Sequence, residues 1–396
     1  MLPLYLLWGI LLSFNDLVSV ALRQEFHLTY RSAVTGQSTF FAVCFLSAPL
    51  VAHRIETRGY RRTIVEGVAI MSTASCVMAV AAAAISRPLF IFGSGLLGLG
   101  ANLLQTAGAV YVTRLGSPGL ATRRFSFALG FNSLGTAIGP LVASLWFVDH
   151  STLARGGSIR PTFILASYLA LAIALAAMAL WFVRLGPRAR NDDTIIKSTV
   201  PKDSVRALLR STRLLFGAGV ILLYAGVEVG LGALLVPLLL SVDGQRLSLA
   251  SASRLVAFYW GGAMAGRFLF VPLLGNRRDR IMLIAATLIA ASLLGLSLSM
   301  ISTPAGFLVL GIGLCHSVIV PIVYDFSIRD LGPLTAPGAS LISAMVVGAA
   351  FVPKLLAHVA DRGGLRLALF LLLPCYAVIG LYAFAYPRLT APFSAK

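Results

Sequence analysis

The feature that most constrains this chain is a series of long apolar runs separated by short polar stretches. A helix needs about 20 apolar residues to cross the ~30 Å hydrocarbon core of a bilayer. The chain is 58% hydrophobic and 12% charged over 396 residues, which leaves little room for a soluble domain. We therefore predict an all-α membrane protein with twelve transmembrane helices, over residues 3–22, 34–52, 64–85, 89–113, 125–148, 161–183, 214–240, 251–274, 281–301, 305–328, 337–360 and 366–386.

The longest polar interval divides these runs into six and six. It predicts an N-terminal six-helix half over residues 1–183, a linker over 184–213 and a C-terminal six-helix half over 214–396. Two such halves joined by a basic central loop are typical of the major facilitator fold.

Lysine and arginine are concentrated in the polar intervals that follow the even-numbered runs. Because short cytoplasmic loops are enriched in these residues, we predict that both termini and the linker are cytoplasmic. The same loops account for the formal net charge of +18, so no nucleic-acid partner is expected. The preference for arginine over lysine fits a GC-rich bacterial genome, and we expect a monomer in the lipid of a bacterial inner membrane.

Two carboxylates that lie well inside apolar runs, Asp16 and Glu228, are the predicted proton-coupling residues. Asp16, beside Asn15, lies in the first run, and Glu228 lies near the middle of the seventh. A carboxylate at such depth costs at least ~2.5–3.5 kcal/mol, so it must face protein or water rather than lipid. Desolvation favours its neutral form, which makes it suited to take up a proton. For each acid the alternative is a buried structural pair.

The segment HRIETRGYRR (53–62) resembles the major facilitator loop motif. Glu56 matches its acidic position and Arg61 and Arg62 its basic pair, while Thr57 departs from the usual arginine. Together with Arg58, these charged residues are expected to act as a gate, a clasp that stabilises one of two conformations. A second basic cluster, GNRRDR (275–280), stands at the matching place in the other half, as expected of two repeats.

Several further segments, spread in order over almost the whole chain, resemble the fucose–galactose–glucose:proton symporter family. They are FNDLV (14–18), LLQTAGAVYVTRLG (103–116), FNSLGTAIGPL (131–141), YAGVEVGLGALLV (224–236), AFYWGGAMAGRF (257–268) and GASLISAMVVGAAFVP (338–353). The resemblance implies a sugar–proton symporter, with Asp16 at the position of the family's proton-carrying aspartate.

This chain departs from the family pattern at positions that bear on the substrate. Gly108-Ala109-Val110 replace the usual Ala-Asn-Pro. Gln105, which cannot titrate, stands where a family member has a second acid, and Leu129 stands where that member has a sugar-contacting glutamine. The resemblance therefore says less about the sugar than about the fold.

Six side chains are predicted to bind substrate, each with a structural alternative. Neutral hydrogen-bonding groups in membrane helices bind a substrate about as often as they join helices. Aromatic side chains stack on sugars or simply pack. The candidates are Asn15, Gln105, Asn132, Tyr259, Trp260 and Lys354.

Lys354 stands where the family pattern has a second proline. It either snorkels toward the outer surface or points into the cavity, where Glu228 or a substrate carboxylate would be its counter-ion. Two other polar residues inside apolar runs are predicted to have structural roles. His316 is expected to be a satisfied neutral histidine rather than a proton relay, and Asp325 to pair with Arg329 four residues on.

No nucleotide-binding loop, nucleophile motif or metal-ligand cluster appears in the sequence, so neither an enzyme nor a cofactor is expected. We predict a secondary active transporter that takes up a small hydroxylated solute, a monosaccharide in the favoured reading, by proton-coupled alternating access. Two alternatives remain. One is a major facilitator importer or exporter of an organic anion or siderophore-like molecule. The other is a non-transporting membrane sensor, against which the sequence argues because a sensor needs an output domain and the longest polar interval is the linker 184–213.

Overall fold

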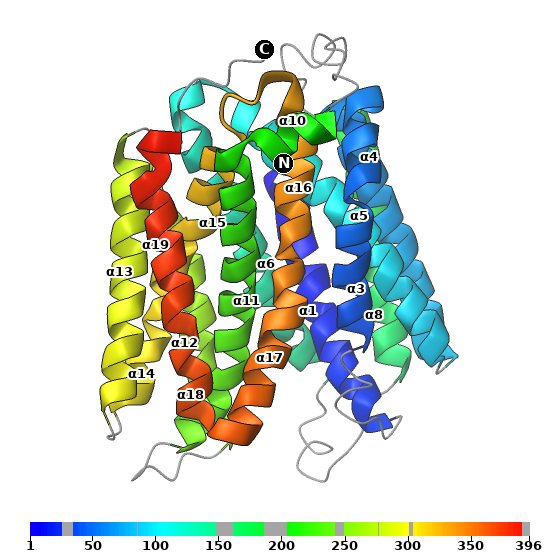
Figure 1. Cartoon of the computed structure of the whole chain (residues 1–396). Coiled ribbons are helices and arrows are strands. Elements are labelled where there is room, and N and C mark those ends of the chain that lie inside the picture. Colours follow the sequence, from blue (N-terminus) through cyan, green and yellow to red (C-terminus); the bar gives the residue numbers. More distant parts are fainter. Residues whose placement is uncertain are drawn as a thin grey trace. The chain divides into compact units, whose positions relative to one another are not determined.

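The computed structural model describes residues 1–25, 35–84, 86–147, 161–185, 204–241, 249–275, 277–300 and 304–389. Within these ranges every regular element is a helix (Figure 1). Eight of the described helices or helix series are long and apolar enough to cross a membrane, and the shorter segment Leu2–Phe14 is also apolar. The all-helical prediction is confirmed.

The chain divides into two compact units, and the first contains residues 1–112 and 131–199. In this unit α4 packs along α8, and α1 also contacts α8. Its helices are α1 (Leu2–Glu25), α3 (Thr35–Leu46), α4 (Ala48–Ala83), most of α5 (Arg87–Arg114), the second part of α6 (Ala121–Phe147) and α8 (Pro161–Leu185).

The second unit contains residues 113–130 and 200–396. In it α11 packs against α12, α15, α17 and α19, and α13 runs beside α19 (Figure 1). Its helices are η1 (Pro118–Leu120), the beginning of α6, α10 (Ser204–Arg210), α11 (Thr212–Ser241), α12 (Leu249–Leu269), η2 (Val271–Leu273), α13 (Arg277–Ser299), α14 (Pro304–Leu310), α15 (Ile312–Ile328), η3 (Gly332–Leu334), α16 (Thr335–Ala344), η4 (Met345–Val347), α17 (Gly348–Gly363), α18 (Leu365–Phe370) and α19 (Leu372–Leu389).

Glycine and proline decide where the helices bend. The second and third apolar runs join through α4, whose backbone turns at Gly59 with φ 76° and ψ 167°. That positive φ is one that a residue with a Cβ rarely adopts. In α15, Pro321 has no N–H, so the carbonyl of Ser317 cannot receive the usual helical hydrogen bond. Pro387 has the same effect on the carbonyl of Ala383 in α19.

Small residues allow α11 and α17 to approach closely. A Cβ built on Gly226 would lie 2.3 Å from the side chain of Val352, and one built on Gly230 would lie 2.5 Å from that of Leu356. Glycines at this helix-face spacing allow two membrane helices to pack closely. They also orient Glu228, which lies two residues from each glycine and therefore on the opposite side of α11.

Candidate functional site

A polar cluster inside the second unit surrounds Glu228, and Arg267 supplies its positive charge. Glu228 lies on α11 and Arg267 on α12, with 3.8 Å between the carboxylate Oε1 and a guanidinium nitrogen. Their side chains are 18% and 11% exposed, respectively. An ion pair this far from water is strongly coupled, since removing one partner leaves the other charge buried. The pair is therefore a place where gaining or losing one proton has a large energetic consequence.

Two buried tyrosines hold Glu228, one from its own helix and one from α12. The hydroxyl of Tyr224, one turn earlier on α11, lies 2.9 Å from Glu228 Oε1 and 3.0 Å from the backbone carbonyl of His316. The hydroxyl of Tyr259 on α12 donates to the backbone carbonyl of Glu228 at 3.1 Å. Both rings are essentially inaccessible, so these hydroxyls have no water to replace a lost partner.

His316 on α15 connects the tyrosines to a third one. Its Nδ1 lies 2.9 Å from the Tyr259 hydroxyl, and its Nε2 lies 2.7 Å from the hydroxyl of Tyr376 on α19. Because the Tyr259 hydrogen is used on the Glu228 carbonyl, His316 Nδ1–H must be the donor to Tyr259. Nε2 is then the acceptor for Tyr376. The geometry agrees with the predicted reading of His316 as a satisfied neutral histidine.

Lys354 does not share this cluster. It is exposed on α17, while Glu228 points from the far side of α11 toward α12 and α15. The counter-ion described for Glu228 is Arg267, and the pairing of Glu228 with Lys354 stays a prediction. A snorkelling lysine and a lysine that meets an anionic substrate both remain compatible with this position.

The aromatic candidates differ in their environment. Tyr259 is fully buried and its hydroxyl is committed to Glu228 and His316. Trp260 is 41% exposed and contacts Tyr259 edge-on, with ring centroids 5.0 Å apart. Of the two, only Trp260 offers a surface on which a substrate can stack.

The candidates of the first unit lie on α1, α5 and α6. Gln105 is the one residue between 100 and 113 that is not buried, so its amide reaches a less occluded space than its neighbours do. The Asn132 amide donates to the backbone carbonyl of Tyr5 at 3.3 Å, which joins α6 to α1. Asn15 and Asp16 belong to α1, but their side chains lie outside the described part of the chain.

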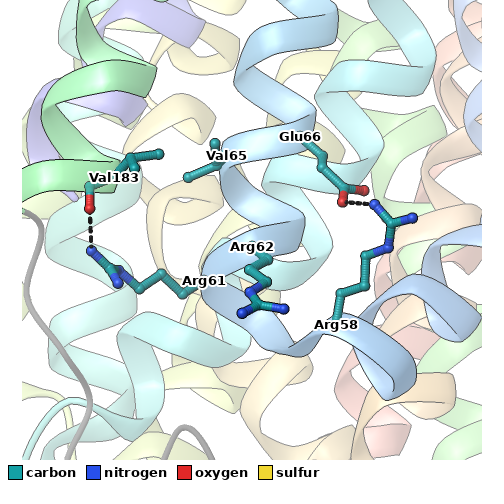
Figure 2. Close-up of a pocket in the computed structure, with 6 residues that line it drawn as sticks. All are labelled: Arg58, Arg61, Arg62, Val65, Glu66 and Val183. Atoms are coloured by element: carbon teal, nitrogen blue, oxygen red, sulfur yellow. Dashed lines mark hydrogen bonds and ion pairs between the residues drawn. The ribbon is translucent and has the colours of Figure 1, made fainter.

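The predicted gating motif folds around the bend at Gly59, and its acidic partner is Glu66 (Figure 2). Glu66 forms ion pairs with Arg58 and, at 3.1 Å, with Arg54. Both arginines precede the bend and Glu66 follows it, so the pairs close the turn. Glu56, the expected acid, is half-buried on the first arm of α4. Arg58, Arg61, Arg62 and Glu66 line a pocket of about 390 Å³.

Arg61 binds the end of another helix. One of its guanidinium nitrogens donates to the carbonyls of Phe182 and Val183 at 2.9 Å each, in the last turn of α8. Figure 2 shows the contact with Val183. The last four carbonyls of a helix lack donors within the helix, and a cation there also interacts favourably with the helix dipole. The guanidinium also lies over the ring of Phe182, 5.9 Å from its centroid.

Arg280 repeats this arrangement in the second unit. It donates to the carbonyls of Ala383 at 3.1 Å and Phe384 at 3.2 Å in α19, and it lies over the Phe384 ring at 5.7 Å. The Ala383 carbonyl is the one that Pro387 deprives of its helical donor. The two basic clusters that the sequence places at matching positions therefore make matching contacts with the last long helix of each half.

A second pair of buried carboxylates lies where α6 begins. Asp279, in the first turn of α13, accepts from the Gly275 N–H at 2.6 Å and from the Thr122 hydroxyl at 2.9 Å. That hydroxyl also lies 3.4 Å from Asp325, which is paired with Arg329. The predicted Asp325–Arg329 pair is confirmed, and it is part of a larger cluster.

Sequence reasoning missed several of these residues. Arg267 was visible as a basic residue inside an apolar run, and that position was a signal for a buried pair. Tyr224 stands four residues before Glu228, the spacing of neighbours on one helix face. Tyr376, Glu66 and Asp279 had no signal of comparable strength, because each meets its partners only through the fold.

Comparison with known proteins gives a consistent picture. The Major Facilitator Superfamily model matches residues 2–333. The chain is 30% identical over 380 residues to a glucose/galactose transporter of Brucella abortus, covering 96% of this chain and 91% of that protein. It is 24% identical over 414 residues to the L-fucose-proton symporter of Escherichia coli, covering 96% and 90% of the two chains. The crystal structure of the transporter FucP in its outward conformation matches with a TM-score of 0.84 over 97% of both chains, at 21% identity.

These matches define a multi-pass membrane transporter rather than an enzyme. The chain belongs to the major facilitator superfamily and, within it, to the fucose–galactose–glucose:proton symporter family.

Proposed function

We propose that this chain takes up a monosaccharide together with protons by alternating access, and that Glu228 and Asp16 carry the protons. Relatives that match over most of the chain are named as glucose/galactose transporters and as an L-fucose-proton symporter. The observation that carries the proposal for this chain is the buried Glu228–Arg267 pair, a titratable group and a cation 3.8 Å apart inside an apolar helix bundle.

The pair supplies a physical link between proton and substrate. With Glu228 ionised, the carboxylate attracts Arg267. With Glu228 protonated, that attraction is lost and the guanidinium donors become available to substrate oxygens. Another guanidinium nitrogen of Arg267 lies 3.5 Å from the backbone carbonyl of Leu129, the position at which the family resemblance implies a sugar contact. Arg267 therefore lies beside both the proton site and a candidate sugar position.

The remaining candidates complete the proposal. Asn15, Gln105 and Asn132 offer hydrogen bonds to sugar hydroxyls, and Trp260 offers an exposed ring face. The basic clusters around Arg61 and Arg280 act on the conformational balance of each half. The chain works as a monomer in a bacterial inner membrane with both termini in the cytoplasm, and the proton gradient is its energy source.

Transport by the purified protein tests this proposal. Proteoliposomes with an imposed proton gradient, acidic outside, are expected to accumulate D-glucose, D-galactose or L-fucose above the external concentration. A protonophore is expected to abolish accumulation while leaving sugar exchange at equilibrium intact. Accumulation that is indifferent to the protonophore would contradict proton coupling.

A non-sugar cargo is the second candidate. Arg267 beside the proton site and the exposed Lys354 are two cations that would suit an organic anion. A thermal-shift panel of neutral sugars, sugar acids and other organic anions separates the two. Stabilisation by anions alone, weakened in Lys354→Met, would favour this candidate over the monosaccharide.

A further inference from the structure

The Tyr224 hydroxyl is placed between two acceptors that it cannot both satisfy. It lies 2.9 Å from Glu228 Oε1 and 3.0 Å from the carbonyl of His316, and it has one hydrogen to donate. The ring is 1% exposed, so water does not replace the bond that is not made. The direction of the hydroxyl must therefore depend on which acceptor is stronger.

The protonation state of Glu228 decides that competition. An ionised carboxylate is a stronger acceptor than a backbone carbonyl, so Tyr224 then donates to Glu228. A protonated Glu228 has an O–H of its own, which can donate to the Tyr224 oxygen. The Tyr224 hydrogen is then released to the His316 carbonyl, forming a continuous chain from Glu228 through Tyr224 to α15.

We propose that Tyr224 is a positioning residue that reads the protonation state of Glu228 and transmits it to α15. The inference rests on the proposed function, in which Glu228 gains and loses a proton. Protonation adds a hydrogen bond between α11 and α15, and deprotonation removes it. No atom has to move far, because the same hydroxyl serves both arrangements.

The acceptor on α15 lies where that helix is easily deformed. His316 directly precedes Ser317, whose carbonyl loses its helical donor to Pro321. A bond made or broken at His316 thus acts beside a weak point of the helix. The ring of the same histidine is held by Tyr259 and Tyr376. The change in hydrogen bonding therefore acts on a residue that is held in one orientation.

The groups that face Glu228 come from four helices. Of these groups, Tyr224 is the one whose hydroxyl can change its hydrogen-bond acceptor. Arg267 has a fixed charge, and Tyr259 binds the Glu228 backbone, which does not titrate. His316 contributes its carbonyl, and Tyr376 reaches the cluster only through the His316 ring. Among the described contacts of the Glu228 side chain, the Tyr224 hydroxyl is the neutral group that has a second acceptor.

The test measures D-galactose affinity as a function of pH in purified full-length protein. Wild type is expected to show an affinity change of about fivefold or more between acidic and alkaline pH, the lower range of typical coupling. Tyr224→Phe keeps the buried ring and removes the hydroxyl, so only the direct Glu228–Arg267 link remains, and the change of its affinity with pH is expected to be at least about twofold smaller than in wild type. The matched control Tyr382→Phe loses another buried hydroxyl, bonded to Ser327, and is expected to keep the wild-type profile.

A fluorinated tyrosine tests the same hydroxyl without removing it. Incorporating 3-fluorotyrosine at position 224 makes the phenol a stronger donor, which favours ionised Glu228 and moves the pH midpoint of affinity to lower values. The same residue at position 382 is expected to leave the midpoint unchanged. A wild-type midpoint with 3-fluorotyrosine at 224, or a wild-type profile in Tyr224→Phe, would overturn the inference.

Failure of the proposed function has a different signature. Glu228→Gln mimics the neutral acid and is expected to hold affinity at its acidic value at all pH. If Glu228→Gln retains the wild-type pH profile, Glu228 is not the coupled acid, and the inference falls with that assignment. Absence of binding of D-galactose, D-glucose and L-fucose by wild type would contradict the monosaccharide proposal itself.

Discussion

The carboxylate of Glu228 and the guanidinium of Arg267 lie 3.8 Å apart on neighbouring helices of the second unit. Neither group is fully sealed from its surroundings, yet each depends on the other for charge compensation. This combination suits a transport site better than a structural one. A carboxylate that exchanges protons needs access for the proton, and it needs surroundings in which its charged form is costly.

Breaking this pair from the cationic side is predicted to be costly. Arg267→Met leaves Glu228 without its counter-charge and should reduce stability by about 3–5 kcal/mol if Glu228 stays ionised. Adding Glu228→Gln should recover much of that stability without restoring accumulation of sugar. Thermal unfolding in detergent measures the first effect and vesicle uptake the second. Arg362→Met, at the exposed end of α17, is the control, and an equal loss in both arginine variants would contradict the assignment.

Two acids flank the bend at Gly59, Glu56 three residues before it and Glu66 seven residues after it. Glu66 pairs with two arginines across the bend, whereas Glu56 was the acid expected from the motif. Glu66→Gln should therefore change the transport rate and lower thermal stability more than Glu56→Gln, with little change in sugar affinity for either. Each exposed pair contributes at most about 1 kcal/mol, so a modest shift is expected. A larger effect of Glu56→Gln would restore the motif's acid as the functional one.

Arg280 and Pro387 form a compensating pair that can be tested by rescue. Arg280→Gln removes donors to the Ala383 and Phe384 carbonyls, and a buried carbonyl without a donor costs about 1–3 kcal/mol. Pro387→Ala supplies a backbone N–H to Ala383, so the double variant should be more stable than Arg280→Gln alone. The midpoint of thermal unfolding of the single and double variants measures this difference. If Pro387→Ala raises thermal stability by the same amount in wild type and in Arg280→Gln, the two residues are independent.

Thr122 is predicted to matter through its hydroxyl group rather than its shape. Thr122→Val preserves the shape but removes the donor to the buried Asp279, with an expected loss of about 1–3 kcal/mol. Thr122→Ser retains the donor and should be close to wild type. Denaturation midpoints of the two variants give the comparison, and equal destabilisation by both would show that packing, not the hydrogen bond, is responsible.

The sequence predicted the helices well because long apolar runs leave a membrane chain few alternatives. It also identified Glu228, since an acid in the middle of such a run is expensive whatever surrounds it. The partners of Glu228 were harder to predict from the sequence. Arg267 is separated from Glu228 by most of two helices, and the rotation of each helix about its axis, which brings them together, is not fixed by hydropathy alone.

Local motifs predicted fewer of the contacts where the chain bends. The spacing of HRIETRGYRR points to Glu56, but the turn at Gly59 reverses the chain so that Glu66 meets Arg54 and Arg58. In the same way, the basic cluster at 275–280 was recognised as a repeat of the first. Its target could not be known, because the Ala383 carbonyl becomes available only through Pro387.

Sugar-driven proton movement tests the central claim most directly. D-galactose or D-glucose added to proteoliposomes without an imposed gradient should alkalinise the external medium in wild type. Glu228→Gln and Asp16→Asn, which mimic the protonated acids, should fail to do so while still exchanging labelled sugar across the membrane. Alkalinisation at the wild-type rate in Glu228→Gln would contradict the account.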